Sequence, residues 1–153
     1  MKRILNWEDR LIDYIELNRY RTFSYGLFDC VHLVVGATLA MTGESLSNGR
    51  LKPYKGHRGA ITALKAQAKK LGMDAPDDFN DLLYAVIDAT FTTSGLIKIE
   101  KPYISRGDLV FIKESELSLG VCVGQSIAAP GKDGLKFLPT SAAIEGYMIP
   151  WVE

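Results

Sequence analysis

Apolar positions are spaced differently in the two halves of the chain. Near the amino terminus they recur every three or four residues, whereas after about residue 95 they form short runs separated by Gly, Pro and Ser. Trp7, Leu11, Ile12 and Ile15 make the first stripe and predict an amphipathic helix, which Asn6 is placed to cap.

Three further helices are predicted downstream. The apolar run 30–41 follows Asp29, a good N-cap residue, and should end near Gly43. The apolar spacing over 59–71 predicts a third helix. A fourth is predicted over 81–89.

The remaining segments read as a loop and as strands. Residues 44–58 carry two glycines and a proline, which predicts a loop. The β-prone runs are 97–100, 107–113, 119–129, 135–139 and 146–152.

Helices followed by strands predict an α+β fold, with N-terminal helices packed on a C-terminal antiparallel sheet. The 153 residues fit one domain spanning 1–153. No internal repeat, low-complexity tract or linker divides them.

Composition narrows the classes of function. The chain is 47% hydrophobic and 24% charged, as in ordinary globular proteins. Its 18 basic residues balance its 18 acidic ones. This balance argues against non-specific nucleic-acid binding and is compatible with a subunit of a larger protein assembly. The longest apolar stretch, 31–41, is too short to span a bilayer. Acidic residues interrupt the segment where a signal peptide would be apolar, so synthesis in a cytoplasm is expected.

Cys30 is the first candidate for chemistry. Cys30 and Cys122 lie far apart in the sequence, and no structural disulfide is expected between them. A thiol in the first turn of a helix faces the positive end of the helix dipole, which favours the thiolate. The residues alone leave two readings open: Cys30 is a nucleophile, or a small apolar residue packed at a helix start.

Three motifs resemble, in the same order, those of the NlpC/P60 cysteine peptidases. They are YGLFDCVHLV (25–34), RGDLVFI (106–112) and LGVCVG (119–124). Together with the Gly-Leu-x-Phe-Leu-Pro segment at 134–139, they look like a divergent branch found in the tail modules of tailed bacteriophages.

The resemblance implies a papain-like fold in which Cys30 attacks an amide. In that family a strand histidine accepts the thiol proton, and a polar residue on the next strand orients the imidazole. The corresponding positions here are Ser118 and Ala128. No histidine follows His57, so both partners of the thiol are expected to be missing.

The two histidines in the chain are poor substitutes for the missing base. His32 is two residues beyond Cys30 on one helix, where side chains point about 200° apart, so a buried or interface role is expected. His57 lies in the predicted loop, upstream of the sheet. It would have to fold over the site to act as a base.

Other cofactor or metal chemistry is not indicated. Cys30, His32 and Cys122 lack zinc-site spacing, and residues 74–81 lack the glycine and glutamate of a calcium loop. Residues 124–134 lack phosphate-loop order and read as a hairpin turn. No metal and no cofactor are therefore expected.

The leading hypothesis is a structural or assembly component of a bacteriophage tail tip that has lost peptidase activity. Such a protein would be made in the host cytoplasm, reside in the virion and bind other tail proteins. Its candidate anchors are exposed aromatic residues. These candidates are Tyr20, Tyr54, Tyr103 and Trp151.

Two alternatives stay open. The chain could be an active peptidase or amidase that cleaves peptidoglycan cross-links during phage entry, with Cys30 as nucleophile and His57 or a partner chain supplying the base. It could also be a small binding or inhibitor domain unrelated to phages.

Overall fold

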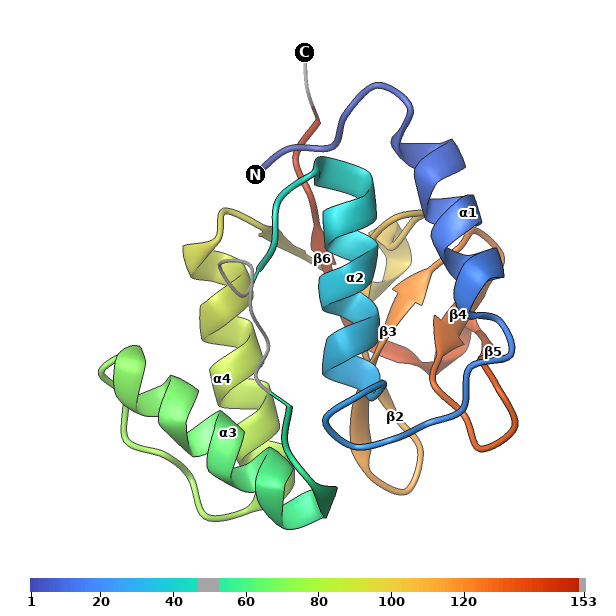
Figure 1. The fold of residues 1–153 in the computed structure, drawn as a ribbon. Helices are drawn as coiled ribbons and strands as arrows, with labels where there is room; N and C mark the ends of the chain where they lie inside the picture. The colour runs from blue at the N-terminus through green and yellow to red at the C-terminus, as the bar shows by residue number, and fades with distance from the viewer. Residues whose placement is uncertain (47–52, 152–153) are drawn as a thin grey trace.

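The computed structural model describes residues 1–46 and 53–151 and has an α+β architecture, with four helices followed by a six-stranded antiparallel sheet (Figure 1). The helices are α1 (Trp7–Asn18), α2 (Cys30–Thr42), α3 (Gly56–Lys70) and α4 (Phe79–Thr93). The strands are β1 (Ile97–Ile99), β2 (Leu109–Lys113), β3 (Leu117–Cys122), β4 (Ser126–Ala129), β5 (Lys136–Pro139) and β6 (Ala143–Met148). Two 3₁₀ helices lie between strands: η1 (Lys101–Tyr103) between β1 and β2, and η2 (Thr140–Ala142) between β5 and β6.

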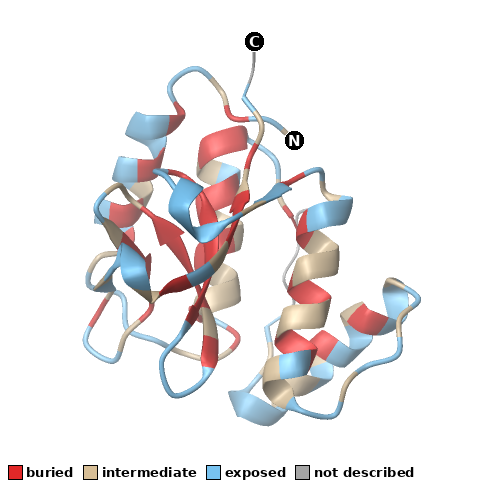
Figure 2. Ribbon diagram, turned by 180° about the vertical axis from the view of Figure 1, so that it is seen from behind, coloured by how far each residue is buried: buried red, intermediate tan, exposed pale blue. Residues whose placement is uncertain are grey.

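The sheet has the strand order β1-β6-β2-β3-β4-β5, so β2 and β3 are central. Alternate residues face opposite sides of each strand. Leu109, Phe111 and Leu119 join the main core beneath the helices, while Val110 and Ile112 join a smaller cluster on the other face. Figure 2 shows this buried sheet from behind.

The helices contact the sheet to different extents. α1 packs closely on α2, where Tyr14 lies against Gly36 and donates a hydrogen bond of 3.2 Å to the Leu33 carbonyl. α2 packs on β3, whereas α3 and α4 form a hairpin to one side of α2 (Figure 1). Within the described residues, no helix has the length and apolar character needed to cross a membrane.

The ends of α2 agree with the sequence prediction. The Asp29 side chain accepts a hydrogen bond from the His32 amide, as an N-cap does. Gly43 ends the helix in the left-handed conformation, at φ 77°. Asn6 occupies the N-cap position of α1, as predicted, but its side chain makes no capping hydrogen bond.

The Gly-Asp-Leu motif has a structural role at the junction of the two termini. Gly107 adopts φ +88° and leaves room for the Trp7 ring, since a Cβ there would lie 2.6 Å from it. Asp108 forms a buried ion pair of 2.9 Å with Arg3, whose guanidinium also stacks on Trp7 and Trp151. This cluster holds the amino-terminal segment against the carboxy-terminal one, and Figure 1 shows both termini at the same end of the molecule.

Three predicted boundaries are corrected by the structure. Helix α3 starts at Gly56, so residues 56–58 are helical rather than part of a loop. The run 119–129 belongs to two strands, β3 and β4, because Val123 to Gln125 form a turn. For the same reason, the hairpin-turn reading of 124–134 is wrong at 126–129, which form β4. The predicted loop residues 47–52 lie outside the described residues.

Candidate functional site

A cleft of about 1290 Å³ lies among α2, α3, α4 and the β2–β3 and β4–β5 connections. One half is apolar, with walls from Val34 of α2, Leu64 of α3 and Ile87 of α4. The other half holds Cys30 and most of the polar groups, which makes the cleft a candidate functional site.

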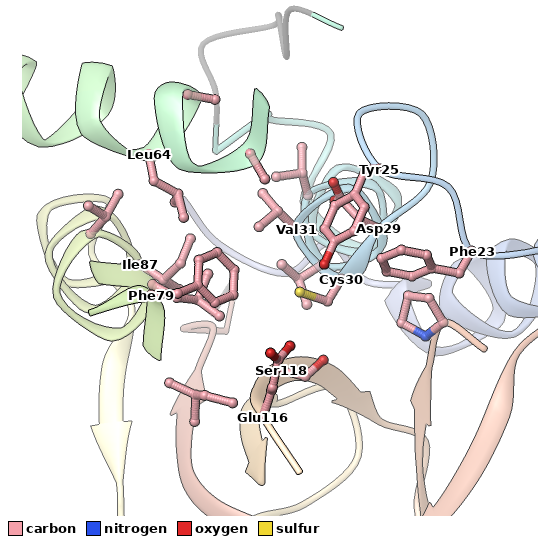
Figure 3. Close-up of a pocket in the computed structure, with 18 of the residues that line it drawn as sticks. Phe23, Tyr25, Asp29, Cys30, Val31, Leu64, Phe79, Ile87, Glu116 and Ser118 are labelled. Carbon is pink, nitrogen blue, oxygen red and sulfur yellow. The ribbon is translucent and has the colours of Figure 1, made fainter. Parts of the chain in front are cut away.

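Cys30 opens α2 and faces the beginning of β3. Figure 3 shows its sulfur pointing toward the strand that carries Ser118, with Tyr25 on one side and Phe79 across the cleft. The structure therefore brings together the two residues that the sequence placed at the nucleophile and base positions. Among the described residues, no histidine hydrogen-bonds to the thiol.

The Cys30 thiol is not activated by this environment. Burial and the negative charge of Asp29 raise its pKa to about 11, and hydrogen bonds from Ser118 and from the Leu119 and Val31 backbone only partly oppose them. The expectation that the helix dipole would favour the thiolate is thus wrong, because burial and the adjacent carboxylate outweigh it.

Asp29 organises the loop that precedes α2. Besides the His32 amide, its carboxylate accepts hydrogen bonds from the Gly26 amide at 3.1 Å and from the Tyr54 hydroxyl, and it contacts His32 Nδ1 at 2.7 Å. Burial acts to raise the pKa of Asp29, but the hydrogen bonds from His32 and Tyr54 outweigh it and lower the pKa. Asp29 is therefore a charged carboxylate that fixes the loop beside the thiol.

In the Tyr-Gly turn of the motif, Gly26 packs directly against the backbone of Tyr54. Gly26 has φ +78°, and a Cβ there would overlap the Tyr54 backbone carbonyl. Tyr54 was predicted as an exposed anchor, but it is only partly exposed and its hydroxyl is bound to Asp29. Nothing in the sequence signals this contact, because 25 residues separate the two partners.

The two histidines lie apart from the thiol. His32 is largely buried and held by Asp29. His57 is exposed in the first turn of α3, where its ring lies 5.8 Å from that of Tyr25 and 4.5 Å from that of Phe79. His57 thus lies near the mouth of the cleft, and its contacts are with aromatic rings.

Ala128, at the position of the orienting residue, lies in the middle of β4. It is fully buried, pairs with Val121 and Phe137, and adds a methyl group to the main core. A side chain at Gly120 would come within 2.8 Å of the Ala128 carbonyl oxygen. The site thus has no polar side chain at position 128 that could orient a base.

The other predicted aromatic anchors differ in exposure. Tyr20 and Tyr103 are 84% and 73% exposed, so both are available to a partner. Trp151 is about half exposed, but its ring packs edge-on against Trp7 at 5.3 Å.

Two cleft residues were missed by the sequence analysis. Tyr25 lines the cleft, and burial together with the charge of Glu116 raises its pKa. Glu116 precedes β3, and Figure 3 shows its carboxylate directed into the cleft beside Ser118. The position of Tyr25 in the cysteine motif could have identified it, whereas Glu116 carries no such signal.

The described residues contain no group of three or more His, Cys, Asp or Glu side chains that could hold a metal ion. The chemical groups that line the cleft are a thiol, hydroxyls, carboxylates and lysine ammonium groups.

Fold and site together define an α+β domain whose helix-start cysteine faces the first residues of a central strand across a cleft. The chain belongs to the family described as Domain of unknown function (DUF6950), whose model matches residues 2–149. No curated protein matches the chain.

Proposed function

We propose that the chain is a degenerate NlpC/P60-like domain with a papain-like fold that has lost peptidase activity and serves as a structural or assembly component of a bacteriophage tail tip. The observation that carries the proposal is the pairing of Cys30 with Ser118 where a peptidase of this class needs a base. A thiol with a pKa of about 11 is almost entirely protonated near neutral pH and is a poor nucleophile.

The phage assignment is supported by the order of the sequence motifs and by the balanced charge of the chain. A tail component would retain the cleft and expose side chains such as Tyr20 and Tyr103 for neighbouring tail proteins. It would be found in the virion after assembly in the host.

The loss of peptidase activity is tested by the pH dependence of Cys30 alkylation. The measurement uses Cys122→Ser, so that Cys30 is the only thiol, and repeats it with His57→Ala. We expect half-maximal alkylation well above pH 8.5 and no change when His57 is removed. A thiol pKa below 7 that rises in His57→Ala would instead identify His57 as a relocated base and support the peptidase.

The tail assignment needs a separate experiment. Mass spectrometry of purified particles should detect the chain in the virion, and phage lacking it should show altered or missing tail tips by electron microscopy. Intact, infectious particles without the protein would contradict a structural role.

A further inference from the structure

The cleft is long as well as large. On α4 it is lined from Phe79 to Thr90, eleven residues later on the same face of the helix. At 1.5 Å per residue, this wall is about 16 Å long. An extended peptide rises about 3.3 Å per residue, so about five residues would fit along it.

The apolar half suits aliphatic side chains. Val31 and Val35 of α2 are partly exposed and face the α4 wall formed by Leu83 and Ile87. Burying a branched aliphatic side chain removes apolar surface from water and favours binding. Two such side chains would supply a substantial part of the binding free energy.

The polar half carries one carboxylate without a partner. Asp29 is saturated by its own loop, and Glu114 is paired with Lys136. Within the described residues, the Glu116 carboxylate has no hydrogen bond or ion pair. Lys70 and Lys132 also line the cleft, but they come from the end of α3 and from the β4–β5 connection.

Aromatic rings gather on the side of the cleft around Tyr25, opposite Glu116 (Figure 3). Ring centroids lie 4.8 Å apart for Phe23 and Tyr25, 5.8 Å for Tyr25 and His57, and 4.5 Å for His57 and Phe79. A cleft that combines a carboxylate with aromatic faces favours an organic cation, since both groups attract positive charge. Of the natural side chains, lysine and arginine have this character.

We propose that the cleft binds, without cleaving it, an extended segment of a partner protein in which a lysine or arginine lies beside aliphatic residues. The basic side chain reaches Glu116, the aliphatic ones enter between α2 and α4, and the neutral Cys30 and Ser118 groups face the peptide backbone. The inference rests on the proposed loss of catalysis and adds the chemistry of the ligand.

The test uses a bead-bound library of acetylated hexapeptide amides with three proteins: the wild type, Glu116→Lys and the control Glu100→Lys, which changes an exposed carboxylate outside the cleft. The wild type and the control should select lysine or arginine next to aliphatic residues. Glu116→Lys should bind the best such peptide at least tenfold more weakly and prefer peptides with Asp or Glu at that position.

Several outcomes would overturn the inference. They are an absence of enrichment, enrichment without a basic residue, and selection that Glu116→Lys leaves unchanged. Tighter binding of a soluble muropeptide than of any library peptide would assign the cleft to the cell wall instead.

The same experiment separates the two proposals. Recovered peptides should have their full mass; cleaved peptides would contradict the loss of catalysis while leaving peptide binding in place. Absence of binding by a protein whose thiol stays unactivated would reject the peptide ligand and leave the noncatalytic role standing.

Discussion

In two clusters of the molecule a tyrosine hydroxyl donates a hydrogen bond to a carboxylate, and one of the two clusters borders the cleft. In the first, Tyr54 donates to Asp29 at the start of α2. In the second, Tyr147 of β6 reaches Asp88 of α4 at 2.5 Å and Glu145 at 2.9 Å.

The clusters differ in what balances the negative charge. The Lys98 ammonium lies 2.8 Å from Asp88 and 3.3 Å from Glu145, so the second cluster contains its own cation. Asp29 is held by amide and hydroxyl donors and by the His32 ring. The negative charge of Asp29 acts on the neighbouring Cys30 thiol and helps to raise its pKa.

The comparison shows that shifted pKa values alone do not identify a functional site. Burial and the two carboxylates raise the pKa of Tyr147 strongly. Its hydroxyl nevertheless has a structural role, since it joins α4 to β6 and Tyr147 is fully buried. Networks of hydrogen bonds and ion pairs that only stabilise a fold shift the pKa values of their members, just as active sites do. Only the Asp29 cluster adds a cleft and a thiol, and the predictions below separate its two roles.

The largest effect is expected for Asp29→Ala. It leaves the donors of Gly26, His32 and Tyr54 without an acceptor and should lower the free energy of unfolding by about 3 kcal/mol. It should also lower the Cys30 pKa. Urea denaturation and alkylation profiles measure the two effects. The matched control Asp78→Ala removes an exposed N-cap and should cost only about 1 kcal/mol.

The next effect concerns the base position. In Ser118→His, a protonated imidazole beside Cys30 should lower the thiol pKa by about 2, equivalent to about 2.7 kcal/mol. Ser118→Ala removes a hydrogen bond to the thiol and should raise that pKa slightly. Alkylation rates against pH report both. Equal pKa values in the two variants would show that residue 118 does not face the thiol in solution.

The ends of α2 and the helix-then-strand order could be predicted because they depend on local signals. Asp29 and Gly43 are the cap residues of α2 and lie directly beside the ends that they define. Apolar periodicity marks most of the other elements. The split of 119–129 into β3 and β4 was missed, because the connection at 123–125 is only three residues long and carries a single glycine between two β-prone runs.

The candidate site was only partly predictable. The family resemblance placed Cys30 opposite Ser118, although the two residues are 88 positions apart in sequence. The Tyr54 contact and the direction of Glu116 depend on how α3 and the β2–β3 connection pack, which no short motif encodes. The direction of the thiol pKa shift was wrong, since burial is a tertiary property.

Tyr147→Phe should have a moderate effect confined to the second cluster. It removes a buried hydroxyl from Asp88 and Glu145, and should lower the free energy of unfolding by about 1–2 kcal/mol. The alkylation profile of Cys30 should not change, because the cluster does not line the cleft. Tyr54→Phe is the counterpart beside the thiol, and a shifted Cys30 profile is expected only there.

The smallest effect is the acid dependence of the second cluster. Burial acts to raise the pKa of Asp88, but hydrogen bonds from Lys98 and Tyr147 and the Lys98 charge outweigh it and lower the pKa. A carboxyl with a lowered folded pKa stabilises the fold above its unfolded value of about 3.9, and this contribution disappears as pH falls through the folded pKa.

The stability difference between wild type and Asp88→Asn should therefore narrow on acidification. The change should stay below about 1 kcal/mol, since Asp88 and Lys98 are both partly solvated. Asp29 also has a lowered pKa but is nearly buried, so the gap for Asp29→Asn should close by more over the same pH range. Urea midpoints from pH 6 to pH 3 measure both differences. A larger change for Asp88→Asn would mean that protonation of Asp88 in the Lys98 cluster affects the stability of the fold more than protonation of Asp29 beside Cys30 does.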